Sequence, residues 1–293
     1  MHLKTRIKDA VVGLWGSIQF TRRLIHKWIK CGRFKYPYKN SGINQSIYVL
    51  ANGPSLNEEI VELRQQGTLF KEPLFVVNFF GLSPSFSELK PSRYCLADSG
   101  FFIDRLRVDE TSHLIGILNK EVTWSMNLYV QDACYSIAKK KIINENIRVV
   151  PISTLHYSGF ECIRSYFYRK GWSTPSFVNV LMMVEYVCLN EGFKTIYLYG
   201  ADHTFLNNLI VGDDNVLYVN DEHFYGKEKT IADIHPDGKP WRVAEFIYDK
   251  YLTFIEHDVM RRYADYLGAK IINCTKGSLI DSYVRLAQLE RNE

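Results

Sequence analysis

The chain has 293 residues, of which 46% are hydrophobic and 23% charged, and its net charge is +4. These values are typical of a globular protein with one large domain, or with one domain and an appendage. No apolar run is long enough to span a bilayer, and the N-terminus lacks the uninterrupted apolar core of a signal peptide. Six scattered cysteines without a C-x-x-C pair indicate buried thiols in a reducing compartment.

Residues 1–42 differ from the rest of the chain. Ten lysines and arginines face a single acid, Asp9, and apolar residues that include Trp15 and Trp28 recur at helical spacing. This pattern predicts a basic amphipathic helix that binds an anionic membrane surface. The alternative is a helix that packs on the domain or on another subunit. We expect a cytoplasmic protein, peripheral on the inner face of the bacterial cytoplasmic membrane, with Pro37 and Gly42 marking the linker.

Strand and helix patterns alternate over residues 43–293. The strand patterns cover 46–51, 74–78, 92–97, 114–118, 125–130, 147–152, 195–199 and 270–274. The helical patterns cover 55–66, 132–141, 158–168, 176–191, 243–266 and 278–290. Alternation at this spacing predicts an α/β fold of Rossmann-like type, with a mostly parallel sheet and helices on both faces. A ligand is then expected at the carboxyl ends of the strands.

The most informative motif follows the first strand pattern. The apolar run 47–51 breaks into Asn52-Gly53-Pro54-Ser55, and a helical pattern begins at once. Ser55 or Asn57 can cap that helix. A tight turn that leads into a helix N-terminus directs free N–H groups at one place, where they can bind phosphate. The alternative is an ordinary strand-to-helix turn.

Other strand patterns also end on small or polar residues. These are Asn78 after the second, Asp98 after the third, and Gly200 with Asp202 after residues 195–199. We expect them to line one nucleotide pocket, since amides and carboxylates bind ribose hydroxyls and base edges. Thr174 or Ser176 is expected to cap the helix over 176–191 and to make a second anion site.

A lid is expected around residues 205–242. Within it, Gly212-Asp213-Asp214-Asn215 indicates a hairpin turn rather than a metal site. Residues 221–227 place His223 and Tyr225 beside two acids and Lys227, and His235 lies in the loop 231–240 that follows. A histidine in such a segment is a candidate general base, with His203 the second candidate.

Together these motifs resemble bacterial sialyltransferases that use CMP-sialic acid, and the related MptE-like family of surface-polysaccharide and flagellin-glycosylation loci. The resemblance covers roughly residues 46–285 and rests on 52–56, on Asn78 and on 192–202. It implies that Asn52, Asn78, Asp98, Thr174 and Ser176 bind the nucleotide, and the strand-end and helix-start positions add Gly53, Ser55, Gly200 and Asp202. Lys227 stands where these sialyltransferases have their catalytic histidine, so His223, His203 or His235 would be the base. Tyr225, Ser176 or Thr174 would assist the departing phosphate.

The resulting hypothesis is an inverting glycosyltransferase that moves a CMP-activated acidic sugar to a bacterial surface glycan. It needs no metal or other cofactor, and we expect no nucleic-acid partner. One alternative is an MptE-like pterin diphosphokinase that uses ATP and Mg²⁺, with Asp98 and Asp202 as metal ligands. The other is a non-catalytic nucleotide-binding protein of polysaccharide assembly.

Overall fold

The computed structural model describes residues 2–31, 46–69, 71–207, 209–223, 226–235 and 237–289. Side chains are not described for 2–9, 30–31, 220–229 and 289. The expected linker at Pro37 and Gly42 lies outside the described residues, as does Tyr225.

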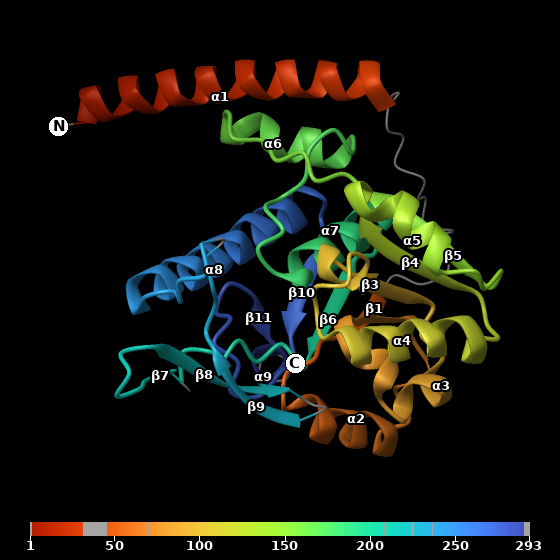
Figure 1. The fold of residues 1–293 in the computed structure, drawn as a ribbon. Coiled ribbons are helices and arrows are strands. Elements are labelled where there is room, and N and C mark those ends of the chain that lie inside the picture. The colour runs from red at the N-terminus through yellow and green to blue at the C-terminus, as the bar shows by residue number, and fades with distance from the viewer. Residues whose placement is uncertain are drawn as a thin grey trace.

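An eight-stranded sheet forms the centre of the molecule (Figure 1), and every pair of neighbouring strands in it is parallel. The order is β11-β10-β6-β1-β2-β3-β4-β5. The strands are β1 (Ser46–Leu50), β2 (Leu74–Val77), β3 (Arg93–Leu96), β4 (Met126–Gln131), β5 (Ile147–Ile152), β6 (Thr195–Tyr199), β10 (Lys270–Asn273) and β11 (Val284–Arg285). The predicted α/β, Rossmann-like fold is confirmed.

Strand β1 is the point where the strand order reverses. The chain runs from β1 through β5 in one direction across the sheet, and then returns to add β6 and β10 on the other side of β1. In open α/β sheets the crossovers at such a reversal point diverge and leave a crevice at the carboxyl ends of the strands, which is the usual place for a ligand. Here the crevice position is the carboxyl ends of β1 and β6.

Helices cover both faces of the sheet, and each face buries its own apolar core. One face carries α7 (Val180–Glu191) and α8 (Val243–Tyr266). The other carries α2 (Leu56–Gln65), α3 (Ser85–Leu89), α4 (Val108–Glu121) and α5 (Tyr135–Lys141). Short 3-10 helices η1 (Asn78–Leu82), η2 (Ser99–Phe101) and η3 (Asp132–Cys134) follow strand ends, and α9 (Leu286–Leu289) follows β11.

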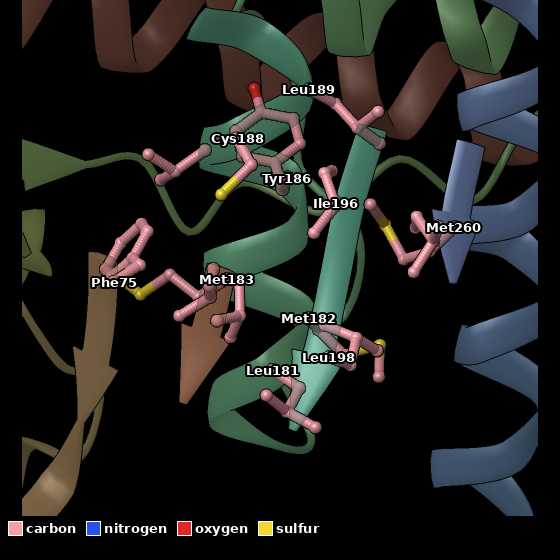
Figure 2. Packing of buried hydrophobic residues seen from close by; sticks show 14 of the residues in the cluster. Phe75, Leu181, Met182, Met183, Tyr186, Cys188, Leu189, Ile196, Leu198 and Met260 are labelled. Carbon is pink, nitrogen blue, oxygen red and sulfur yellow. The ribbon is translucent and has the colours of Figure 1, made fainter. Parts of the chain in front are cut away.

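Helix α7 is the most buried helix of the fold. Every residue from Leu181 to Leu189 is buried, because α7 lies between the sheet and α8. Figure 2 shows its side chains packed against Phe75 and Ile196 of the sheet and against Met260 of α8. A helix that is apolar all round is expected in such a position. Its one central acid, Glu185, is therefore unusual.

Helix α1 (His2–Cys31) packs along α6 (Glu161–Arg169) and the segment before it. One face of α1 makes this contact. Gly13 and Gly16 allow the helix to approach residues 158–160 closely, and Phe20 and Leu24 further along the same face are buried against Leu155 and Tyr157. The opposite face of α1, which includes Trp15 and Ile18, is exposed. Thus the predicted helix exists and packs on the domain. None of the described helices combines the length and apolar character needed to cross a bilayer.

The expected lid contains a separate antiparallel sheet of β7 (Leu209–Val211), β8 (Leu217–His223) and β9 (Gly226–Ile231). The predicted hairpin is present, since Gly212 N donates to Val216 O at 3.0 Å and Asn215 has a φ of +60°. Leu217 and Val219 pack on Phe246 near the start of α8. Strands β8 and β9 pair antiparallel, and His223 is the last residue of β8.

Two predicted elements are wrong. Residues 114–118 belong to helix α4, because burying Leu114 and Leu118, one helical turn apart, outweighs the strand-like composition of the run. Residues 278–290 are a loop, the short strand β11 and α9 rather than one helix. The loop form lets the chain turn back onto the end of β6, where Leu279 N donates to Asp202 O at 2.9 Å.

We expect Gly16→Ala to weaken the docking of α1. A Cβ at Gly16 would overlap the carbonyl of Ser158, with the carbonyl carbon only 2.8 Å away, and backbone cannot move aside cheaply. Limited proteolysis of α1 should therefore accelerate. Gly116→Ala in α4 is the matched control, because a Cβ there meets nothing within 4 Å and should stabilise the helix by about 1 kcal/mol. Equal proteolysis of Gly16→Ala and wild type would contradict the packing described.

Candidate functional site

Two strand-end segments meet at the crevice between β1 and β6. Ala51 N donates to Tyr199 O and Gly53 N donates to Gly200 O, both at 2.8 Å. A Cβ at Gly53 would overlap the carboxylate of Asp202 and lie 2.6 Å from Gly200 O. The close approach of the two turns thus requires glycine at position 53, which accounts for one residue of the motif.

The carboxylate of Asp202 joins these segments. Its oxygens accept hydrogen bonds from Ser55 Oγ at 2.8 Å and from Ser55 N at 3.4 Å. Ser55 precedes the first residue of α2 but makes no side-chain cap, which corrects the capping role expected for it. Burial raises the pKa of Asp202, and the two Ser55 bonds oppose that shift. The anion at the start of α2 is therefore a carboxylate of the chain itself.

Glu59 is a second buried acid beside Asp202. Its Oε2 accepts a hydrogen bond from Gly200 N at 2.6 Å, whereas its buried Oε1 has no partner among the described residues. Burial raises the pKa of Glu59 to about 7, and the charge of Asp202 adds to that shift. The turn after β6 is thus held by two carboxyl groups, one of which ionises near neutral pH.

Polar side chains with free hydrogen-bonding capacity follow β1 and β2. The register pairs Leu50 with Val76, so Asn52 and Asn78 come at matching places two residues further on. Both are half-buried, and neither amide has a side-chain partner within the described ranges. Asn78 has a φ of +48°. Asp98, after β3, is exposed and accepts from Gly100 N at 2.7 Å. The structure thus brings Asn52, Gly53, Asn78, Gly200 and Asp202 to one edge of the sheet.

The segment before α7 differs from the prediction. Helix α7 begins at Val180, and its cap is Asn179, whose Oδ1 accepts from Leu181 N at 2.9 Å. Thr174 is instead bonded through its backbone to Leu155, while Ser176 N donates to Glu256 of α8 at 3.3 Å. The predicted caps at Thr174 and Ser176 are wrong, because these tertiary contacts hold residues 174–176 in an extended path across the carboxyl edge.

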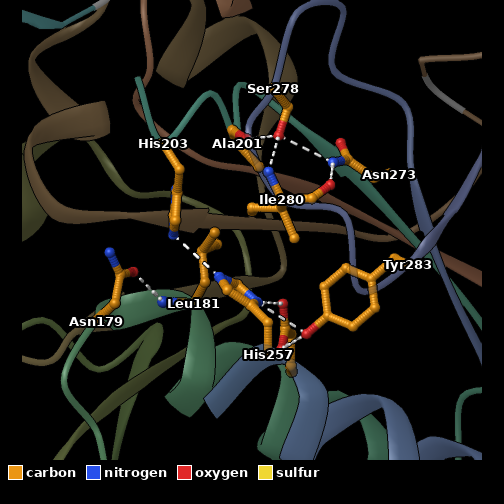
Figure 3. Close-up of polar contacts among 10 residues, drawn as sticks. Asn179, Leu181, Ala201, His203, His257, Asn273, Ser278, Ile280 and Tyr283 are labelled. Carbon is orange, nitrogen blue, oxygen red and sulfur yellow. Dashed lines mark hydrogen bonds and ion pairs between the residues drawn. The ribbon is translucent and has the colours of Figure 1, made fainter. Parts of the chain in front are cut away.

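His203 follows Asp202 directly and has a φ of +52°. Its Nε2 lies 3.0 Å from Nε2 of His257 in α8, and Nδ1 of His257 lies 2.9 Å from the hydroxyl of Tyr283 (Figure 3). Tyr283 in turn donates to Oε2 of Glu185 at 2.7 Å. Burial, reinforced by His257 and Lys250, lowers the pKa of His203 well below its ordinary value. His203 is therefore neutral at physiological pH.

Sequence reasoning did not find Glu185, His257 and Tyr283. They lie 26–98 residues from their partners along the chain, and no local motif contains them. The one available signal was an acid in the middle of the apolar pattern over 180–189. A buried carboxyl in an apolar helix needs a polar partner, so Glu185 was a predictable anchor of some network.

The other histidine candidates belong to the lid. The ring of His235 is half-exposed, 3.2 Å from Glu245 at the start of α8 and near Trp241. The backbone of His223 pairs with Gly226, and its side chain is outside the described set, as are those of Tyr225 and Lys227. Their proposed roles remain predictions.

The residues that the structure describes contain no group of three or more His, Cys, Asp or Glu side chains placed to hold a metal ion. Asp98 follows β3 and Asp202 follows β6, and these strands are three positions apart in the sheet. At the usual strand spacing that is about 14 Å, too far for both carboxylates to bind one Mg²⁺.

Neither a protein-family model nor a curated protein matches the sequence. Among solved structures, the chain is similar to the MAf glycosyltransferase from Magnetospirillum magneticum AMB-1, with a TM-score of 0.49 and 14% identity. The match covers 88% of this chain and 36% of the other, so the chain spans about a third of that protein's length. The function proposed below therefore rests on the site rather than on this neighbour.

We expect Glu59→Gln to change how stability depends on pH. The pKa of Glu59 is raised from 4.5 to about 7, so its contribution is fully present below pH 4.5 and is lost as pH rises through 7. Glutamine keeps an acceptor for Gly200 N but cannot ionise. At pH 8 the variant should be more stable than wild type by roughly 2 kcal/mol, with a much smaller difference at pH 5.

The measurement is urea unfolding of both proteins across this pH range. Glu58→Gln is the control, since Glu58 is an exposed acid in the same helical turn. A stability difference for Glu59→Gln that stays constant with pH would contradict the buried, neutral state inferred for this carboxyl.

Proposed function

We propose that this protein is a glycosyltransferase that moves a CMP-activated acidic sugar to a bacterial surface glycan. The observation that carries the proposal is the convergence of unpaired amides and a neutral histidine at the reversal point of the sheet. Asn52 and Asn78 offer a donor and an acceptor each, which suits a cytosine edge or ribose hydroxyls. His203 follows β6, the strand next to β1. The sequence resemblance described above adds the nucleotide class.

In the proposed reaction, a neutral histidine removes the proton of the acceptor hydroxyl. The oxygen then attacks the anomeric carbon through an oxocarbenium-like state, and CMP leaves from the opposite face with inversion. His223 is the base that the sequence favours. The position of His203 at the crevice favours His203 instead, because Nδ1 of this ring has no hydrogen-bond partner in the described part of the chain.

The reaction is proposed to proceed without a divalent metal. A CMP donor releases one phosphate, which a nearby cation can stabilise. Lys250 is such a cation, since it affects the pKa of His203 and lies over the ring of Phe205 at 5.0 Å. The alternative pterin diphosphokinase would need Asp98 and Asp202 to share Mg²⁺, and the strand spacing disfavours that arrangement.

The test combines binding and turnover. CMP should raise the melting temperature of wild type more than UDP, GDP or ATP does, and Asn52→Ala should abolish most of that shift. Gln65→Ala is the control, because Gln65 is an exposed amide at the far end of α2. CMP release from a CMP-sugar should continue in EDTA, and His203→Ala should slow it by two to four orders of magnitude.

Magnesium-dependent release of AMP from ATP would contradict the transferase and favour the kinase. Binding of CMP without turnover would favour the accessory role. If His223→Ala abolishes release while His203→Ala does not, the base is the residue that the sequence favoured.

We also propose that the outer face of α1 binds an anionic membrane, where a lipid-linked glycan acceptor would be found. Val11, Trp15, Ile18, Ile25 and Ile29 form an exposed stripe on successive turns, opposite the stripe that packs on the domain. Next to it, a groove of about 730 Å³ is lined by basic side chains, namely Arg22, Arg23 and His26. An apolar stripe flanked by positive charge suits a bilayer that carries acidic headgroups.

We expect the Trp15→Ser, Ile18→Ser double variant to lose co-sedimentation with vesicles that contain phosphatidylglycerol. Wild type should sediment with these vesicles, less so as salt is added, and hardly with phosphatidylcholine alone. Ile143→Ser removes a comparably exposed side chain elsewhere on the surface and serves as the control. Equal sedimentation of the double variant and wild type would contradict the membrane role.

A further inference from the structure

The polar chain behind the crevice links four side chains from distant parts of the sequence. Its contacts are His203 Nε2 to His257 Nε2 at 3.0 Å, His257 Nδ1 to Tyr283 Oη at 2.9 Å, and Tyr283 Oη to Glu185 Oε2 at 2.7 Å. Glu185 and His257 are fully buried, Tyr283 and His203 are nearly so, and His203 is the end member of the chain (Figure 3). We propose that these four residues form a proton relay, in which a proton accepted at Nδ1 of His203 is balanced by protonation of Glu185.

Each contact in the chain holds one proton, and this fixes how the chain is arranged. When Glu185 is ionised it can only accept, so Tyr283 must donate to it. The Tyr283 oxygen then accepts from Nδ1–H of His257, whose Nε2 is left as an acceptor. That nitrogen takes the proton of His203 Nε2. A neutral His203 consequently carries its lone pair on Nδ1.

The remaining ring nitrogen of His203 keeps slight exposure. Nδ1 has no hydrogen-bond partner within the described residues, yet it is not among their fully buried, unpartnered atoms, although the residue as a whole is only 9% exposed. While Glu185 is ionised, a carboxylate buried in α7 therefore leaves a proton acceptor at Nδ1 of His203, after the end of β6.

The relay would work by concerted shifts of four protons. The proton of an acceptor hydroxyl moves to Nδ1 of His203, and the Nε2 proton of His203 moves to Nε2 of His257. The Nδ1 proton of His257 moves to the Tyr283 oxygen, and the Tyr283 proton moves to Oε2 of Glu185. The hydroxyl has lost one proton and Glu185 has gained one, while both imidazoles and the phenol remain neutral. Release of the proton from Nδ1 of His203 to solvent restores the first arrangement.

Burial explains why the proton would end on Glu185. It lowers the pKa of His257 to about 3, so an imidazolium at this place is strongly disfavoured. It raises the pKa of Glu185 to about 8, so this carboxyl holds a proton readily. Protonated Glu185 would donate from Oε2 to Tyr283 rather than from Oε1, because Oε1 makes no hydrogen bond and its nearest polar contact, Nδ1 of His257, is 3.6 Å away. The whole chain then reverses, and His203 carries its proton on Nδ1.

Other charges surround the chain. Lys250 affects the pKa of His203, and Asp258 affects the pKa values of His257 and Tyr283. Arg261 also affects the pKa of Tyr283, and the thiol of Cys188 interacts with Glu185. Asp258 opposes the effect of burial on His257, and Lys250 reinforces it on His203. Of the four relay members, Glu185 is the one whose ionisation falls near neutral pH.

The inference rests on the proposed function only in naming a hydroxyl as the proton source, so its first test does not use activity. Nitrogen-15 spectra of the full chain, labelled at histidine, report the tautomer of each ring, and His203→Asn and His257→Asn assign the two signals. As pH rises through about 8, both rings should stay neutral and His203 should change from the Nδ1–H to the Nε2–H tautomer.

Tyr283→Phe removes one link and should abolish this change of tautomer. Tyr186→Phe is the matched control: it removes a neighbouring buried hydroxyl that donates to the backbone carbonyls of Tyr168 and Ser173, and it should leave the change intact. If His203 charges as an ordinary imidazole, or keeps one tautomer from pH 6.5 to 9.5, the relay is overturned whether or not the protein is a glycosyltransferase.

The kinetic readout then links the relay to turnover. Tyr283→Phe and Glu185→Gln should each lower kcat for CMP release at least tenfold with KM for the donor nearly unchanged, while Tyr186→Phe should stay within twofold of wild type. Normal kcat in both relay variants, in an active enzyme, would overturn the relay and leave the transferase standing. Absence of transfer in wild type would overturn the proposed function, and the tautomer measurement would still decide the relay.

Discussion

The junction between β1 and β6 depends on buried carboxyl groups. Asp202 holds the start of α2 through Ser55, and Glu59 reaches back from α2 to Gly200 N. These contacts join the first and sixth strands, which are 145 or more residues apart in sequence and form the reversal point of the sheet. The other strands of the sheet are aligned, each through its neighbour, on β1 and β6. The same contacts bring the turns after β1 and β6 close enough to form one site.

Burying carboxyl groups at this junction destabilises the fold, and the destabilisation is smaller when the groups are uncharged. A buried carboxylate without full partners destabilises the fold, so Glu59 and Glu185 hold raised pKa values, and the buried histidines hold lowered ones. The interior is therefore polar but largely neutral. Groups whose two protonation states are close in free energy near neutral pH are the ones that proton-transfer chemistry requires. Burial of these side chains therefore affects both the stability of the fold and the ability of the side chains to exchange protons.

The sequence predicts the sheet well and the buried polar network poorly, and the reason is the range of the interactions. Strands such as 147–152 and 195–199 are apolar runs bounded by turn residues, so each carries its own signal. The run 114–118 carries the same signal but is helical, because packing of Leu114 and Leu118 overrides composition. Residues 174–176 resemble a helix cap but are held by Leu155 and Glu256, which are distant in sequence.

The site residues also divide into those with a local sequence signal and those whose contacts are distant in sequence. Asn52, Gly53 and Asp202 lie in recognisable strand-end motifs, and the parallel arrangement of the strands brings them together. His257 and Tyr283 lie in a long helix and in a C-terminal loop that was predicted to be helical, and only the tertiary structure pairs them. A local pattern cannot predict a contact between two helices and a loop. It can only mark Glu185 as a group that needs one.

Helix α1 connects the surface to this interior. Lys27 bonds to Asp132 and to Ser153, and Ser17 Oγ lies 2.9 Å from the hydroxyl of Tyr157. The chain then passes from Tyr157 through α6 and the extended segment 173–179 to the cap of α7, the helix that holds Glu185. The packed stripe of α1 and its exposed apolar stripe lie on opposite sides of the helix. The outer stripe can therefore bind the membrane proposed above, or another partner, without release of the inner stripe from the domain.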